Sequence, residues 1–359
     1  MKKLLLLLAI IITCQSALPQ QDISKLSWKK VATGMPDSWY GSDESVRVAE
    51  NVLLYQRNAG GWPKNIEKHR VLTDEQKKAI LKEKENQDAI FDNSATTTEM
   101  RFLALMFNKT GNNSYRESFN KGLKFILDAQ YPNGGWPMFW PLRKGYYTHI
   151  TFNDDAIINI LKLLRDINSG KPLFIKITDD KLKASCTGAF DRGIECILNT
   201  QIVVKGEPTV WCAQHDENTL EPAKARAYEL PSFSGGESAG IVSFLMELPS
   251  PGARVVAAIE GAIKWFEANK IPGIRIEDFT SADGIRDRRV VNDPSSGPLW
   301  ARFYDLATGK PFFCDRDGIK KNNLSEIGYE RRNGYSWYTD APLEALKKYQ
   351  TWKNTVKTK

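Results

Sequence analysis

The chain has 359 residues, of which 26% are charged, and a formal net charge of +7. Its Lys and Arg residues are scattered and form no basic arm or known nucleic-acid motif, which argues against a nucleic acid partner. An acidic polysaccharide is another partner that would suit a positively charged protein. Only three His residues occur, and none has metal-ligand spacing or accompanies a recognisable nucleophile motif, so a zinc enzyme or a Ser–His hydrolase is not expected.

The N-terminus predicts export. Residues 1–17 contain two lysines, an apolar run at 4–12, and small or polar residues after it, the pattern of a signal peptide. That run is too short to be a stable membrane anchor, and no later stretch approaches the roughly 20 apolar residues of a membrane span. We therefore expect a secreted or periplasmic protein. An alternative is a lipoprotein acylated at Cys14, although Thr before the Cys fits that motif poorly.

The rest of the chain predicts one helical domain. Residues 18–44 are expected to form a lead-in, and 45–359 a single domain, because no Pro/Gly/Ser-rich linker divides them. Apolar residues recur with helical spacing and β alternation is scarce, which predicts an all-α protein with long loops and only short β-strands. The predicted helices lie near 95–107, 115–129, 156–164, 184–199, 239–248, 253–268 and 341–352.

A short sequence motif occurs twice and indicates a structural repeat. Gln56 precedes Gly-Gly-Trp-Pro at 60–63, and Gln130 precedes the same four residues at 134–137. A weaker third copy begins at Gln201 and includes a Trp ten residues later. About three such helical hairpins would close into an α/α toroid with its loops gathered at one end as a groove. We interpret the Trp residues as packing between helices, with sugar contact as the alternative.

Carboxylates follow each copy of this motif, at the start of an apolar helix. The segments are Phe-Asp-Asn-Ser-Ala at 91–95 and Phe-Asn-Asp-Asp-Ala at 152–156. Asp92, Asp154 and Asp155 could simply cap helix N-termini, as Asp often does. Grouped in one groove, however, their like charges would be costly unless a cation such as calcium bridged them.

Four cysteines remain after the predicted signal, and none is close to another at metal-finger spacing. An exported protein can form disulfides. The pair that we expect first is Cys186 with Cys196, the nearest two along the chain.

Several longer sequence segments resemble those of a known protein family. They are 58–65, 91–97, 130–137, 150–156, 211–216, 226–232, 300–304 and 331–338. Together they resemble the pectate lyases with an α/α-toroid fold, over nearly the whole chain from about residue 45. The resemblance implies calcium-assisted β-elimination on polygalacturonate, which gives 4,5-unsaturated oligogalacturonides, by a protein that we expect to be a monomer.

The resemblance also implies roles for single residues. Arg226 corresponds to an arginine base, and Asp154 or its neighbour Asp155 to the carboxylate that binds Ca²⁺. Asp92 corresponds to a second acidic group near both metal and substrate. Asn292 stands where we would expect a Lys, which puts one sugar contact in doubt. The basic residues similar to those that clamp substrate carboxylates are Lys64, Arg302 and Arg316.

Two other functions remain open from the sequence. The first is an α/α-toroid glycoside hydrolase that uses a carboxylate pair such as Asp154 and Glu237. The second is a non-catalytic protein that binds pectin fragments, which would account for aromatic loops and basic charge without a base. The loop around Arg226 argues against the second, because a binding protein does not need it.

Overall fold

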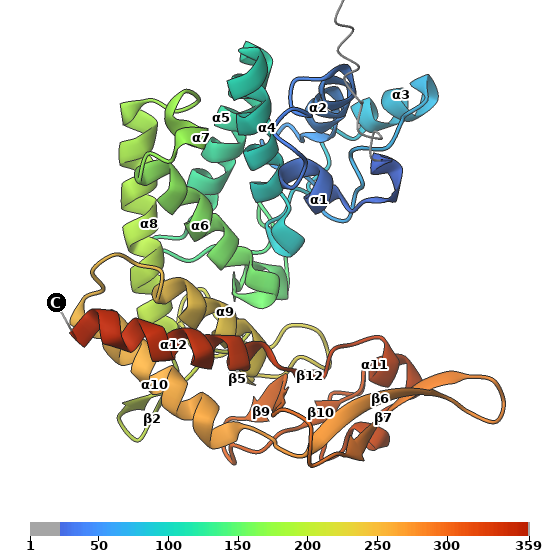
Figure 1. Cartoon of the computed structure of the whole chain (residues 1–359), viewed down its shortest axis with the longest axis vertical. Coiled ribbons are helices and arrows are strands. Elements are labelled where there is room, and N and C mark those ends of the chain that lie inside the picture. The colour runs from blue at the N-terminus through green and yellow to red at the C-terminus, as the bar shows by residue number, and fades with distance from the viewer. Residues whose placement is uncertain (1–21, 358–359) are drawn as a thin grey trace, which may run out of the picture.

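The structure is a computed structural model that describes residues 22–357. The predicted signal peptide at 1–17, including Cys14, lies outside the described residues. No described helix is both long and apolar enough to cross a membrane. The helices, shown in Figure 1, are α1 (Trp28–Thr33), α2 (Asp43–Tyr55), α3 (Asp74–Lys82), α4 (Thr97–Thr110), α5 (Asn113–Ala129), α6 (Ala156–Asn168), α7 (Pro172–Ile175), α8 (Asp180–Thr200), α9 (Gly235–Leu245), α10 (Ala253–Asn269), α11 (Tyr329–Asn333) and α12 (Ala341–Lys357).

The strands are short, apart from one hairpin, and pair only in twos. They are β1 (Ile150–Thr151), β2 (Val203–Val204), β3 (Glu207–Pro208), β4 (Gln214–His215), β5 (Ser232–Ser234), β6 (Ile274–Thr280), β7 (Arg286–Asn292), β8 (Trp300–Ala301), β9 (Phe303–Asp305), β10 (Phe313–Cys314), β11 (Lys320–Lys321) and β12 (Tyr338–Thr339). The antiparallel pairs are β1–β4, β2–β3, β5–β9, β6–β7, β8–β12 and β10–β11.

The main helices alternate between two layers. Helices α2, α5, α8 and α10 contact one another in sequence order, and so do α4, α6, α9 and α12. Every second helix thus belongs to the same layer, and each hairpin adds one helix to each layer (Figure 1). The hydrophobic core lies between the layers. This arrangement confirms the predicted all-α class and the α/α toroid.

The repeated Gln joins neighbouring hairpins. Gln56 ends α2, and its side-chain amide donates to the carbonyl of Gly60 at 2.7 Å and to that of Ser118 in α5 at 2.9 Å. One side chain therefore closes its own loop and satisfies a carbonyl of the next helix in the layer. The corresponding bonds elsewhere are Gln130 to Gly134 and Ala189, and Gln201 to Thr209 and Ala258.

The repeated Trp fills the space between the layers. Trp62 is fully buried, and its indole N–H donates to the carbonyl of Val52 at 2.7 Å. Trp136 and Trp211 are buried equally and donate in the same way to Ile126 and Ile197. The packing interpretation of the Trp residues is therefore confirmed, since none of these three rings can contact a sugar.

A fourth hairpin, α10 and α12, was not predicted as a repeat. Trp300 is also fully buried and donates to the carbonyl of Phe266 in α10, but Lys270 takes the place of the Gln at the end of that helix. The connection from 271 to 340 carries most of the strands, including the β6–β7 hairpin that projects from the body in Figure 1. The loss of the Gln and the insertion of this long segment hide the repeat in the sequence.

The lead-in belongs to the same core. Helix α1 packs on α4, and the indole of Trp28 donates to Glu99 at 2.7 Å. Val31, Ala32 and Tyr40 are also buried in the main cluster.

The predicted disulfide between Cys186 and Cys196 is wrong. Both residues lie on α8, ten positions apart, which separates them by about 15 Å along a helix. A disulfide requires Cα atoms within about 7 Å of each other. All four described cysteines are buried as free thiols.

Candidate active site

A cleft of about 320 Å³ lies where the helices α4 and α6 begin. Its floor comes from the segments just before these helices, and its walls come from the loops that follow the repeated Trp residues. Charged and amide groups line one part of it: Lys64, Asp92, Asn93, Asn153, Asp154, Gln214, Arg226 and Glu229. Four aromatic rings line another: Phe139, Tyr146, Tyr147 and Phe303.

The segments before α4 and α6 have an unusual backbone. Asn93 and Asp154 both have φ near +50°, and the residues after them, Ser94 and Asp155, are also left-handed. Such conformations cost about 1–3 kcal/mol each in residues other than Gly and tend to occur at functional sites. Neither helix has a side-chain cap, so the capping interpretation of the Asp residues is wrong.

Asp92 and Asp154 come from positions that are not equivalent in the repeat. Asp92 matches Asn153, whereas Asp154 matches Asn93, as their φ angles show. The two turns, Asp92–Ser94 and Asn153–Asp155, lie side by side. The sequence therefore places two carboxylates in one cleft by exchanging Asp and Asn between adjacent copies.

The two carboxylates interact. Burial, reinforced by the charge of Asp92, raises the pKa of Asp154 to about 6. Lys64 forms an ion pair with one oxygen of Asp92, while the other, Oδ1, is buried and has no hydrogen-bond partner among residues 22–357. An unpartnered buried carboxylate oxygen beside a second carboxylate is the donor set that a hard cation needs.

Arg226 lies across the cleft in a loop that Glu229 closes. Glu229 accepts from Nε of Arg226 at 2.7 Å, from its Nη2, and from its backbone N–H at 3.1 Å. Tyr335 donates its hydroxyl to the same carboxylate at 2.7 Å. This hydrogen bonding to Glu229 raises the pKa of Arg226 above its already high value. The short run from 226 to 229 thus holds its own guanidinium in place.

Arg302 contacts Asn153, which lines the cleft, but Arg302 is not itself among the lining residues. Its guanidinium donates to Asn153 at 3.0 Å and to Glu237 at 2.9 Å. Although burial alone would lower it, the pKa of Arg302 is raised, chiefly by the charge of Glu237. Glu237 is itself buried and also accepts from Ser234. Its carboxylate is therefore already occupied, which leaves a hydrolase pair of Asp154 and Glu237 without a free partner.

Two predicted residues lie away from the cleft. Arg316 is two-thirds exposed and pairs with Glu330 at 3.0 Å, although its guanidinium also approaches the ring of Tyr228 that Arg226 covers. Asp155 packs against α9, where a Cβ on Gly240 would lie 2.1 Å from its carboxylate. Among the predicted residues, the structure brings together Lys64, Asp92, Asp154 and Arg226.

Sequence reasoning missed Glu229 and Tyr335. Glu229 lies in the same string as Arg226, and a Glu three residues after an Arg in a loop is a signal for an ion pair. Tyr335 lies more than 100 residues away, and no local pattern connects it to this loop. Its ring also faces the guanidinium of Arg302 at 4.5 Å, so it links the two arginines.

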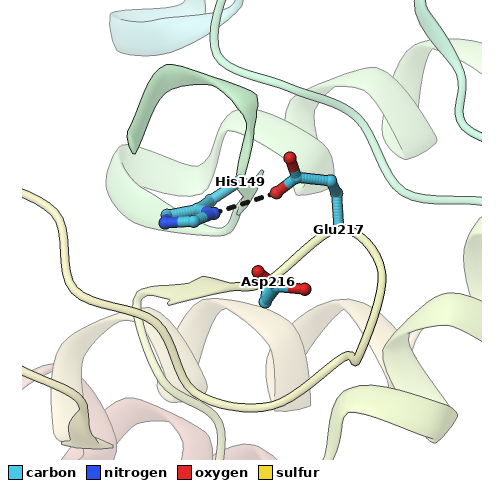
Figure 2. A group of neighbouring side chains, drawn as sticks. All are labelled: His149, Asp216 and Glu217. Atoms are coloured by element: carbon cyan, nitrogen blue, oxygen red, sulfur yellow. Dashed lines mark hydrogen bonds and ion pairs between the residues drawn. The ribbon is translucent and has the colours of Figure 1, made fainter. Parts of the chain in front are cut away.

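A second group that could hold a metal lies at the outer end of the β1–β4 pair. The ligand atoms of His149, Asp216 and Glu217 all lie within 4.8 Å of one another (Figure 2). His149 contacts Glu217 at 3.0 Å, and Asp216 accepts from the backbone N–H groups of Asn218 and Thr219 in its own turn. Existing contacts within the protein thus occupy much of this group.

Solved structures with this architecture define the class of protein. A family 10 polysaccharide lyase from Cellvibrio cellulosa is 32% identical, with a TM-score of 0.76, and the match covers 91% of this chain and 95% of that one. An aspartate-to-alanine mutant described as family 10 polysaccharide lyase from the same organism, in complex with trigalacturonic acid, is 33% identical, with a TM-score of 0.77 and coverage of 90% and 95%. A comparison with curated proteins gave no match.

The family model for pectic acid lyase matches residues 56–346. The chain belongs to this family and is a polysaccharide lyase. This result confirms the resemblance found in the sequence, and it sets aside the hydrolase and the non-catalytic binding protein.

Proposed function

We propose that this protein cleaves polygalacturonate by calcium-assisted β-elimination, with Arg226 as the base. The observation that carries the proposal is that Arg226, Asp92 and Asp154 line one cleft. The trigalacturonic acid in the complex of the similar lyase from Cellvibrio cellulosa supports an acidic sugar chain as the substrate.

The cleft suits calcium better than the group at His149 does. Calcium takes six to eight oxygen ligands, and imidazole suits softer transition metals. Asp92 and Asp154 offer oxygens only, and Oδ1 of Asp92 has no partner within the described residues. Two carboxylates cannot fill the coordination shell, so a substrate carboxylate and water would complete it. When bound, calcium would stabilise the negative charge that develops next to the uronate carboxyl group.

The reaction breaks a C–H bond and a C–O bond. Arg226 takes the proton from the carbon next to the uronate carboxyl group and forms an N–H bond with it, and the electron pair of that C–H bond becomes the new C=C bond. The bond between the next carbon and the glycosidic oxygen breaks, the leaving oxygen takes up a proton from water, and an unsaturated sugar remains at the new chain end. Lys64, the ion-pair partner of Asp92, also lines the cleft and supplies positive charge for the acidic chain.

The surroundings of Arg226 determine when it can act as a base. Its guanidinium is in direct contact with Glu229 and with the rings of Tyr228 and Tyr335. These groups stabilise the protonated form. We therefore infer that the base form arises at alkaline pH, and that turnover rises with pH.

Three further expectations remain proposals. Residues 1–17 would direct export to the periplasm or the medium, with acylation of Cys14 as the alternative. Residues 45–359 would form the catalytic domain, with 18–44 as its lead-in. The protein would act as a monomer.

The test is a direct assay of the product. Polygalacturonate is incubated with the protein at alkaline pH, with calcium or with a chelator, and ultraviolet absorbance of the unsaturated product is followed. We expect absorbance to rise with calcium and not with chelator. Absence of product with calcium present would refute the proposal.

A further inference from the structure

A second cavity, of about 190 Å³, adjoins the cleft on the side of α1. Lys64 and Asn93 line both spaces, so the cavity and the cleft lie on either side of the same two side chains. Asp92, the ion-pair partner of Lys64, lines the cleft and is not among the residues that line this cavity.

Glu99 gives the cavity a buried acceptor. Its side chain is 1% exposed; Oε1 accepts from the indole of Trp28 at 2.7 Å and pairs with Lys68 at 2.8 Å. The other oxygen, Oε2, is buried without a partner within the described residues. Because an unpaired buried acceptor is costly, this atom indicates that a donor from outside the protein, such as a sugar hydroxyl, can bind here.

The rim carries groups that suit an acidic sugar. Lys29, in the first turn of α1, is exposed and lines the cavity. On the rim, the side-chain amide of Asn93 donates to the side-chain oxygen of Asn65 at 3.0 Å. Asn65 has φ of +58°, a conformation that few side chains adopt without strain. Glu67 is an exposed negative charge at the cavity, and its carboxylate lies 3.4 Å from Nδ1 of His69.

We propose that this cavity is a further subsite, which binds one additional unit of the acidic chain beyond Asp92. Lys29 pairs with the uronate carboxylate, the two Asn side chains contact hydroxyl groups, and Oε2 of Glu99 accepts a hydrogen bond from a hydroxyl group. The inference rests on the proposed function, since it assumes that an acidic sugar chain occupies the cleft.

Chain-length dependence tests the subsite. The ratio of kcat/KM for hexagalacturonate to that for the shortest oligomer that is cleaved is measured for the wild type and for Lys29→Ala. A lost charged contact typically corresponds to about a tenfold change, so we expect the ratio to fall by about 5- to 10-fold, with the short oligomer unaffected. Lys30→Ala is the matched control, because Lys30 is exposed on the same helix and does not line the cavity.

A second variant removes a rim contact without straining the backbone. Asn65→Gly deletes the amide while glycine accepts the positive φ, and it should lower the same ratio. An unchanged ratio in both variants, or an equal loss on short and long oligomers, would overturn the subsite. If the wild type gave no unsaturated product, the proposed function would fail instead, and calorimetric binding of hexagalacturonate to wild type and Lys29→Ala would still test the cavity.

Discussion

Arg226 and Glu229 form a closed pair within one short loop, in which one carboxylate binds Nε, Nη2 and the backbone N–H of the same arginine. The carboxylate is nearly buried, whereas the guanidinium remains nearly half exposed to the cleft. The pair therefore fixes the position of the guanidinium and also stabilises its protonated form, which cannot act as a base. An enzyme that uses this arginine as a base gains orientation from Glu229 and depends on pH for deprotonation.

We expect Arg226→Ala to lower kcat by about 10²- to 10⁴-fold, the usual contribution of a positioned base. The same change leaves the carboxylate of Glu229 without its main partner, so the free energy of unfolding should also fall, by about 2 kcal/mol. Turnover measured by ultraviolet absorbance and stability measured by urea unfolding separate the two effects.

The double variant Arg226→Ala/Glu229→Gln is the control for stability. Without the charge at 229, the protein should regain most of the lost stability and none of the lost activity. Normal turnover in either variant would remove Arg226 from the role of base.

Asp92 and Asp154 should govern the response to calcium. Replacing either with Asn removes one anionic ligand, so the calcium concentration needed for half-maximal activity should rise by at least about tenfold. His149→Ala is the matched control, because it disrupts the other candidate metal group and leaves the cleft intact. A calcium response that changed in His149→Ala and not in the Asp variants would relocate the site.

The raised pKa of Asp154 predicts how stability depends on pH. Because its pKa is about 6 in the folded protein, above its ordinary value of 3.8, the folded state holds this proton more tightly than the unfolded state. Stability without calcium should therefore fall as pH rises from about 4 to about 6. The side chain of Asp154 is exposed to solvent in the cleft although its surroundings desolvate it in part. After allowance for solvent screening, Asp154→Asn should stabilise the metal-free protein at pH 8 by about 1 kcal/mol.

Activity should depend on pH in the opposite direction to stability. Calcium and a proton compete for Asp154, so the calcium concentration needed for activity should increase as pH falls through about 6. In Asp154→Asn this dependence should disappear. The measurement is a calcium titration of the initial rate at several pH values, and a dependence that persisted in the variant would assign it to another group.

The repeat and the site differ in how far the sequence predicts them. Gln56 and Trp62 act through contacts within one hairpin and its neighbour, so their spacing alone predicts the toroid. Asp92, Asp154 and Arg226 were found because they belong to uncommon strings. For Asp92 and Asp154, the common cleft follows from the repeat, which brings the turns Asp92–Ser94 and Asn153–Asp155 side by side.

The remaining features depend on contacts between distant segments. Arg302 sits beneath Asn153, 149 residues earlier in the chain, and faces the protein interior for a reason that no local pattern shows. Tyr335 reaches Glu229 across 106 residues. The fourth hairpin lost its Gln and gained an insertion, which removed the spacing on which the repeat was recognised.

The Trp residues should be structural. Trp136→Phe keeps most of the buried ring and removes the N–H that satisfies the carbonyl of Ile126. We expect a loss of about 1–3 kcal/mol in the free energy of unfolding, with KM for polygalacturonate unchanged. A raised KM without loss of stability would contradict the packing role.

The free cysteines should be unreactive in the native protein and should not affect its stability. Cys186, Cys196, Cys212 and Cys314 are buried, and burial raises the pKa of each thiol, to about 12 for Cys186 and Cys196. Because the thiolate is the reactive form, a thiol reagent should label none of the four in the native protein at pH 8 and all four after denaturation. The melting temperature should also be the same with and without reductant. A lower melting temperature in reductant would show that a disulfide forms, and the separation of Cys186 from Cys196 along α8 would then require a different pairing.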